Sequence, residues 1–260
     1  MRYKLTLEYN GTTLIGWQEN IQGPSVQSLI RDAIFKFSQQ DVEVVAAGRT
    51  DAGVHALGMV CHFDLSNEHD PETVMRAINF YLIDSPVAVL DCEIVPDDFH
   101  ARFSCIKRNY RYIILNRPAP VIMDKNMVWW IPRSLDVEKM QAAAAKLIGN
   151  HDWTSFRASE CQAKSPIKTL DKVEIRTKDE VGRTNGGVVS SFVLRNSSLI
   201  EIEFFARSFL HHQVRNMVGT LVEIGLGKPL DIDEIFAAKN RSAAGPTAPA
   251  HGLYFVSAEY

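Results

Sequence analysis

Residues 48–55 read GRTDAGVH and form a loop between two predicted strands, at about residues 42–47 and 57–65. The loop's carboxylate, Asp51, stands between two glycines, which permit backbone conformations that other residues avoid and let a ligand come close. Arg49, two residues earlier, supplies a positive charge that suits a phosphate or that keeps a nearby carboxylate ionised. An ordinary Asx turn uses the same residue types, so on this stretch alone a catalytic loop and a structural turn both remain open.

The residues on either side of this loop predict alternating strands and helices. Residues 3–9 alternate apolar and polar side chains, which is typical of a half-buried strand. Apolar residues at helical spacing predict a helix over 26–37. A second helix is expected to begin at Asp70-Pro71, because proline at the first helical position sacrifices no hydrogen-bonded N–H group. A strand near 87–95 completes a first half of mixed composition.

The rest of the chain repeats this outline of strands and helices. The predicted elements are a strand at 109–115, a helix that begins at Leu135-Asp136, a hairpin of 188–195 with 199–206, a helix capped by Ser208 that carries apolar residues up to Val222, and a last strand at 253–257. On the helix after Ser208, His211 and Arg215 are four residues apart and are expected to share a face.

Two successive halves of this kind predict an α+β protein with antiparallel mixed sheets, its two similar halves joined around a central cleft. We place the N-terminal half at residues 1–105 and the C-terminal half at residues 106–260. Ligands commonly bind in clefts between paired halves, so the cleft is the expected position of a site.

The bulk composition excludes several classes of protein. The chain has 260 residues, a net charge of −3 and no apolar run long enough to cross a membrane. Its four cysteines are scattered and form neither a CxxC motif nor a cluster with histidine, which fits reduced thiols better than disulfides or structural zinc. We therefore expect a cytoplasmic protein without a membrane segment.

Basic residues gather in two stretches that contain no acidic residue. The first lies between Asp98 and Asp124 and interleaves five basic residues with aromatic rings, and the second runs from Phe204 to Val222. Such a mixture suits contact with phosphates and stacking on bases. A solvated strand face has the same composition, so both interpretations stay open.

A metal site is a competing interpretation of the histidines. His55 and the pair His211-His212 have no carboxylate or thiol at a spacing that would complete a site. Residues 97–100, with two aspartates and His100, form the most metal-like cluster. A metal-dependent phosphodiesterase is a separate alternative function, and it predicts loss of activity on chelation.

Taken in order along the chain, several longer motifs resemble those of the TruA-type tRNA pseudouridine synthases. Besides GRTDAGVH, the motifs are YNG at 9–11, GWQ at 16–18, SVQ at 25–27, PDDFHARFS at 96–104, YRY at 110–112, DWTSFR at 152–157, HHQVRNMVG at 211–219 and AHGLY at 250–254. The resemblance covers nearly the whole chain. Two departures are visible: Asn109 stands where the family often has arginine, and residues 178–198 are longer than a short family hairpin needs, which predicts a loop insertion.

The resemblance implies a role for each matching residue. Asp51 corresponds to the essential aspartate that attacks the target nucleoside, Tyr110 to the tyrosine that packs on the uracil, and Arg215 to the basic partner of the aspartate. Arg49 corresponds to the arginine associated with base flipping, and Leu253 to the apolar wall of the uracil pocket. Contacts with phosphates are expected for Arg102, Arg157 and Lys164. For Tyr110, Arg215 and Leu253 the structural alternatives are a packed strand tyrosine, a surface arginine and a core leucine.

The resemblance also implies an activity and partners. It implies an isomerase that converts uridine to pseudouridine at positions 38, 39 and 40 in the anticodon stem-loop of tRNAs, without a metal or other cofactor. The implied assembly is a homodimer that binds tRNA. Two alternatives remain open from the sequence: a pseudouridine synthase with a different RNA target, and a non-catalytic protein that binds or folds tRNA.

Overall fold

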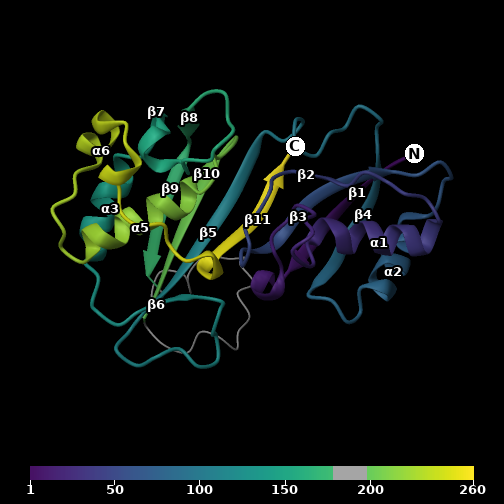
Figure 1. Ribbon diagram of the computed structural model, residues 1–260, viewed down its shortest axis with the longest axis horizontal. Coiled ribbons are helices and arrows are strands. Elements are labelled where there is room, and N and C mark those ends of the chain that lie inside the picture. Colours follow the sequence, from purple (N-terminus) through teal and green to yellow (C-terminus); the bar gives the residue numbers. More distant parts are fainter. Residues whose placement is uncertain (178–197) are drawn as a thin grey trace. The chain divides into compact units, whose positions relative to one another are not determined.

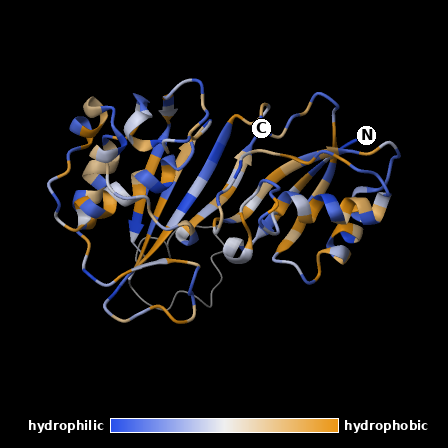
Figure 2. Ribbon diagram, in the orientation of Figure 1, coloured by the Kyte–Doolittle hydropathy of each residue, from blue (hydrophilic) through white to orange (hydrophobic). Residues whose placement is uncertain are grey.

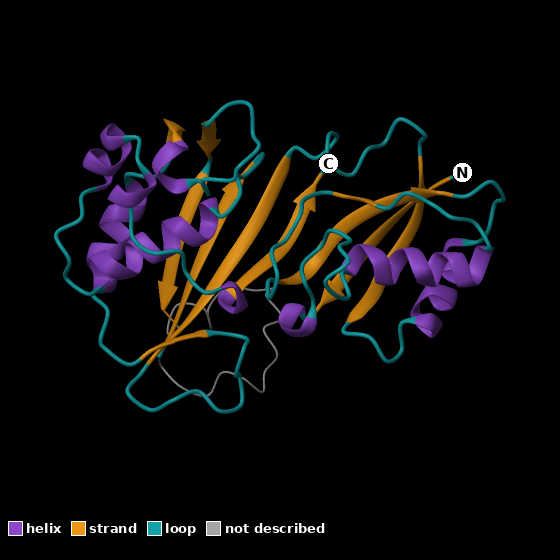
Figure 3. Cartoon of the chain, in the orientation of Figure 1, coloured by secondary structure: helices purple, strands orange, loops and turns teal. Residues whose placement is uncertain are grey.

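The computed structural model describes residues 1–177 and 198–260, which divide into two compact units. Unit 1 consists of Met1–Arg108 with Tyr254–Tyr260, and unit 2 consists of Asn109–Leu253. Each contains helices and strands (Figure 3), so the predicted α+β class is confirmed. The strand expected at 188–195 and most of the expected insertion at 178–198 lie outside the described residues.

Unit 1 is built on a mixed sheet with the strand order β4-β1-β3-β11. The bounds are β1 Arg2–Tyr9, β3 His55–Asp64, β4 Val87–Val95 and β11 Leu253–Glu259, and the short β2 Val45–Ala46 pairs with β3. Strand β1 is antiparallel to both of its neighbours, whereas β11 is parallel to β3 and pairs Tyr254 with His55. The last strand of the chain therefore adds to the sheet that begins at its N-terminus.

The core of unit 1 follows from the alternation along β1. Tyr3, Leu5, Leu7 and Tyr9 are all buried on one face of the sheet, and the matching alternation of colours is visible along the strands (Figure 2). Helices α1 Val26–Ser38 and α2 Pro71–Tyr81 lie side by side against the sheet (Figure 1). Helix α2 begins at Pro71, as predicted, and the Asp70 side chain caps it by accepting a hydrogen bond from the backbone nitrogen of Thr73.

Unit 2 contains the neighbouring strands β5, β10 and β9. The bounds are β5 Lys107–Asn116, β6 Trp129–Ile131, β9 Lys172–Thr177 and β10 Leu199–Ala206, with a separate pair of β7 Gly149–Asp152 and β8 Ile167–Leu170. Strand β6 runs parallel to β5, and β9 runs antiparallel to β10. The helices of this unit are α3 Val137–Ala145, α5 Gln213–Gly225 and α6 Ile232–Ala238.

Helix α5 starts later than the sequence predicted. It begins at Gln213 with His212 as its N-cap in a left-handed conformation, φ 59°, so Ser208 does not cap it and His211 lies outside it. The reason is that the Gln213 side chain accepts a hydrogen bond from the backbone nitrogen of Leu210 at 2.8 Å and closes a turn there. The prediction that His211 and Arg215 share a helical face is therefore wrong.

Short 3₁₀ helices complete the fold: η1 Gly11–Thr13, η2 Trp153–Phe156, η3 Arg241–Ala243 and η4 Ala250–Gly252. Two of them, η3 and η4, flank the stretch of chain that leads into β11. Among the described residues, no helix combines the length and the apolar character needed to cross a membrane.

Candidate active site

Asp51 is held in unit 1 by a loop whose neighbouring residue is firmly anchored. The backbone oxygen of Thr50 accepts a hydrogen bond from the nitrogen of Trp17 at 3.0 Å, and its hydroxyl lies 2.8 Å from the hydroxyl of Tyr9. Asp51 itself pairs with Gly16 in an isolated antiparallel bridge and is partly exposed. The backbone that carries the carboxylate is thus fixed from two sides.

Two glycines outside the motif allow the chain to approach this loop. Gly16 has φ +105°, and a Cβ there would lie 2.5 Å from the oxygen of Thr50. A Cβ on Gly11 would lie 2.1 Å from the oxygen of Val54. The sequence did not predict that these glycines support the loop, because no local pattern indicates backbone contact between residues about 35 to 45 positions apart.

His55 is a structural residue of this loop. Its side chain is buried, and Nδ1 accepts a hydrogen bond from the backbone nitrogen of Gly11 at 3.0 Å. The ring also stacks on Tyr254 with a centroid distance of 4.8 Å. Arg49, in contrast, is exposed at the start of the loop.

The basic stretch after Asp98 divides into exposed and internal residues. Arg102 is exposed, with its guanidinium 5.6 Å from the ring centroid of Phe103. Arg108 is buried and donates from Nε and Nη2 to the oxygen of Ala47, at 2.9 and 2.7 Å, directly before the Asp51 loop. His100, from the metal-like cluster, accepts through Nδ1 from the backbone nitrogens of Arg102 and Phe103.

In unit 2, strand β5 carries the two tyrosines of the YRY motif. Tyr110 is buried, and its ring meets the ring of Phe209 edge-on at 5.1 Å. Tyr112 is fully buried and donates its hydroxyl to the oxygen of Pro249 at 2.7 Å. Burial raises the pKa of Tyr112, and the nearby charge of Arg215 opposes this shift.

Arg111 serves a different purpose from the tyrosines beside it. Its guanidinium donates to Glu203 at 2.8 Å and lies 3.7 Å from Glu201, and all three side chains are largely buried. Burial raises the pKa of Glu201, and the charge of Arg111 acts in the opposite direction. Arg111 therefore forms an internal ion pair, whereas the composition of this stretch would favour contact with RNA.

Arg215 lies in the first turn of α5 and is tied to the segment before β11. Its Nε donates to the oxygen of Ala248 at 2.8 Å, and the nitrogen of Ala248 donates to the oxygen of Arg215 at 3.1 Å. Burial and the nearby charge of Arg215 both lower the pKa of the His251 ring. Unit 2 therefore brings Arg215 together with the segment that ends at Leu253, whose side chain is buried.

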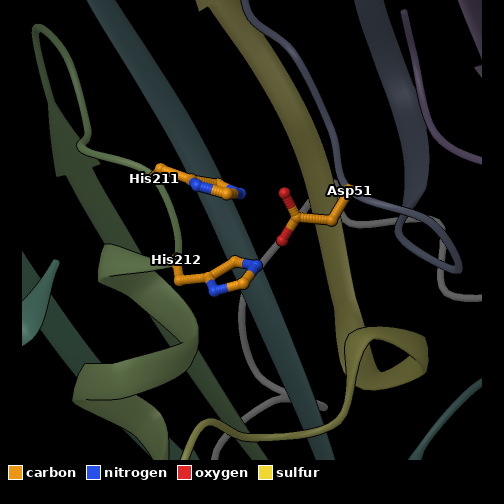
Figure 4. A group of neighbouring side chains, drawn as sticks. All are labelled: Asp51, His211 and His212. Carbon is orange, nitrogen blue, oxygen red and sulfur yellow. The ribbon is translucent and has the colours of Figure 1, made fainter. Parts of the chain in front are cut away.

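The histidines before α5 lie next to each other. Figure 4 shows His211 and His212 in the turn that leads into this helix. The two rings are 4.1 Å apart, and the backbone oxygen of His211 accepts a hydrogen bond from the nitrogen of Ala158 at 2.9 Å. This bond connects the turn to Arg157, which is partly exposed, and Lys164 lies further along the same connection and is exposed.

Comparisons with known proteins agree with the motifs. A family model described as tRNA pseudouridine synthase matches residues 6–104 and 143–260, which include Asp51, Arg215 and Leu253 but not Tyr110. The chain is 51% identical to "tRNA pseudouridine synthase A" of Rhodospirillum centenum, over 100% of this chain and 99% of the relative. It is 48% and 49% identical to the proteins of that name from Ehrlichia canis and Ehrlichia chaffeensis, in each case over the full length of both chains. With matches of this length and identity, the chain belongs to the tRNA pseudouridine synthase family.

Proposed function

We propose that this protein converts uridine to pseudouridine at positions 38, 39 and 40 in the anticodon stem-loop of tRNAs. The observation that carries the proposal is the placement of Asp51 on an anchored backbone loop, in a chain whose full-length relatives bear the name tRNA pseudouridine synthase A. The close backbone approach of Gly11 and Gly16 supports the proposal, because it holds the loop against the rest of unit 1.

The proposed chemistry is an isomerisation in which atoms and electrons balance within the nucleoside. The carboxylate of Asp51 attacks as a nucleophile, and the bond between N1 of uracil and C1′ of ribose breaks. The uracil turns in the site, its C5 forms the new bond to C1′, and the bond that Asp51 had formed with the nucleoside breaks, so the carboxylate is regenerated. The proton on C5 is then lost and N1 gains one, so neither a cofactor nor a co-substrate is consumed.

We assign the remaining residues to binding and to charge control. Arg215 pairs with the nucleophile and favours its ionised form. The ring of Tyr110 packs on the uracil, and Leu253 forms an apolar wall of the pocket. A base within a folded stem must leave the stack before its glycosidic bond is reached, and Arg49 assists this step. Phosphate contacts are made by the three basic residues Arg102, Arg157 and Lys164.

The wider organisation belongs to the same proposal. Residues 1–105 would form the half that carries the nucleophile, and residues 106–260 the half that carries the tyrosine, the arginine and the uracil-pocket residues, with the substrate in a cleft between them. The protein would work in the cytoplasm as a homodimer on tRNA. Local basic patches would guide the RNA, since the net charge of −3 gives no general attraction.

The test is release of tritium from tRNA that is labelled at C5 of uridine, with wild type compared with Asp51→Asn. The substitution keeps the shape of the side chain and removes its charge, so release should disappear while tRNA binding is retained. Asp84→Asn is the matched control, because Asp84 is an exposed aspartate elsewhere in unit 1, and it should release tritium at the wild-type rate. Equal release by Asp51→Asn and wild type would refute the assignment of the nucleophile, and tight binding without any release by wild type would favour a non-catalytic tRNA-binding protein.

A further inference from the structure

Arg241 is a charged residue of unit 2 to which neither the motifs nor the proposed function assigns a role. It lies in η3 and is only partly exposed. Its guanidinium donates to three neutral oxygens: the backbone oxygen of Gly245 at 2.8 Å, Oδ1 of Asn216 at 2.9 Å and Oγ1 of Thr247 at 3.1 Å. Burial lowers its pKa. The guanidinium is thus partly desolvated, and its planar geometry allows it to make several hydrogen bonds at once.

Those three acceptors lie on two different elements. Asn216 is fully buried in helix α5, one residue after Arg215, and its amide nitrogen donates to the oxygen of Phe156 at 2.8 Å. Gly245 and Thr247 lie in the segment 244–252, which leads into β11. Thr247 also donates its hydroxyl to Oδ1 of Asn216 at 2.7 Å. Arg241 and Asn216 therefore join the segment 244–252 to the helix that carries Arg215.

The backbones of the two elements are in direct contact at this point. A Cβ on Gly219 of α5 would lie 1.7 Å from the oxygen of Pro246, and one on Gly245 would lie 2.7 Å from Cα of Thr220. Thr220 also accepts a hydrogen bond at its hydroxyl from the nitrogen of Gly245 at 3.0 Å. Such close contact leaves little room for the segment to shift along the helix without losing these bonds.

The segment ends in the contacts that orient the proposed site residues. Ala248 exchanges two hydrogen bonds with Arg215, one of them from Nε of the guanidinium. Pro249 accepts the hydroxyl of Tyr112, and η4 then leads directly into Leu253. A displacement of residues 245–247 would therefore reach both the guanidinium of Arg215 and the apolar wall at Leu253.

We propose that Arg241 is a positioning residue for the isomerisation: by joining Asn216 to Gly245 and Thr247, it fixes the carbonyl of Ala248 that orients the guanidinium of Arg215. The inference rests on the proposed function for its effect on turnover. Its structural consequence, the orientation of Arg215, is separate and can be observed without any substrate.

Two variants separate this role from general stabilisation. Arg241→Met retains an unbranched apolar side chain in place of the arginine stem and removes all three hydrogen bonds. Thr247→Val removes a single hydroxyl from the same network, and this milder variant is used if Arg241→Met does not fold. Arg31→Met is the matched control, because Arg31 also joins a helix to a loop, through Glu19 at 2.8 Å, on unit 1. Each protein is measured for single-turnover rate, for tRNA binding and for thermal unfolding.

The expected result is a fall of the single-turnover rate by about 10- to 100-fold in Arg241→Met, because small misplacements of a reacting group have effects of this size. The affinity for tRNA should stay within about threefold of wild type, and Arg31→Met should retain the wild-type rate. In an Arg215→Lys background, which lacks the Nε donor, Arg241→Met should slow the reaction far less, since the two residues act through one another. Equal slowing in both backgrounds would overturn the proposal.

A second readout does not depend on activity. The Nε–H resonance of Arg215, identified by its loss in Arg215→Lys, should shift and exchange faster with water in Arg241→Met and Thr247→Val, and should not move in Arg31→Met. An unchanged resonance in both network variants would overturn the positioning role. If wild type releases no tritium while the resonance moves as expected, the proposed function fails and the link from Arg241 to Arg215 stands.

Discussion

Replacing Gly16 by alanine should damage both the stability of the protein and the geometry of the Asp51 loop. Gly16 has φ +105°, a conformation that L-residues rarely adopt, and its new Cβ would meet the backbone oxygen of Thr50 at 2.5 Å and the carbonyl carbon of Asp51 at 3.0 Å. Both atoms belong to the backbone, so rotation of a side chain cannot relieve the contact. The loop must move away from its present position.

Gly227 provides a matched control for the size of this effect. It also has positive φ, +87°, but a Cβ there has no atom within 4 Å, so Gly227→Ala measures the backbone strain alone, about 1–3 kcal/mol. Gly16→Ala adds the cost of overpacking, about 1–3 kcal/mol. We therefore expect Gly16→Ala to lose about 2–6 kcal/mol of unfolding free energy and Gly227→Ala to lose only the strain contribution.

The assay is urea unfolding of wild type and both variants, followed by single-turnover pseudouridine formation under conditions where each variant is folded. Gly16→Ala should react more slowly than Gly227→Ala, because only the former displaces the residues that carry the Asp51 carboxylate. Equal unfolding free energies and equal rates for the two variants would refute the inference that backbone contact with residue 16 holds the Asp51 loop.

Three further substitutions test other parts of unit 2. Tyr112→Phe removes the bond to the oxygen of Pro249 and should lower the unfolding free energy by about 1–3 kcal/mol in urea titrations; no loss would mean that the bond contributes nothing net. Arg111→Met removes the cation that lies 3.7 Å from buried Glu201 and leaves Glu203 with Arg176 alone, at 3.8 Å; it should cost about 3–5 kcal/mol of unfolding free energy at neutral pH. Burial raises the pKa of Glu201 and the charge of Arg111 opposes this shift, so the variant should raise that pKa further. A carboxyl whose pKa is raised in the folded state lowers the stability of the protein as pH rises through that pKa, so the deficit in unfolding free energy should be smaller near pH 5 than near pH 7. A deficit that does not depend on pH would contradict this. Tyr110→Phe should slow tritium release without weakening tRNA binding if the hydroxyl helps to remove the C5 proton, and an unchanged single-turnover rate would exclude that role.

Elements that begin with a local capping signal could be predicted from the sequence. Ser25 caps α1 and Asp70 caps α2, and in both cases the side chain accepts a hydrogen bond from a backbone nitrogen only three residues later. Such a signal is contained in a short stretch of sequence. Helix α5 differs, since its first residue is set by the side chain of Gln213 and by a left-handed His212. A left-handed histidine has no reliable local signal, so Ser208 was a wrong choice of cap.

The site shows the same division between local and long-range information. Asp51 could be proposed from the sequence because its motif is contiguous, whereas its backbone supports at Gly11 and Gly16 come from a distant part of the chain. Arg108 and Arg111 were grouped with RNA-binding residues by composition, yet both form bonds within the protein. Composition cannot distinguish these cases, because the partners of Arg111 are about 90 residues away in the sequence.

The most direct test of the account uses tRNA transcripts in which a single tritium-labelled uridine remains in the anticodon arm, at position 38, 39 or 40, and a fourth transcript labelled only at a uridine outside that arm. The account predicts that wild type releases tritium from each of the first three transcripts and none from the fourth, and that Asp51→Asn releases none from any. Release from the fourth transcript alone would contradict the proposed target, and release by Asp51→Asn would contradict the mechanism.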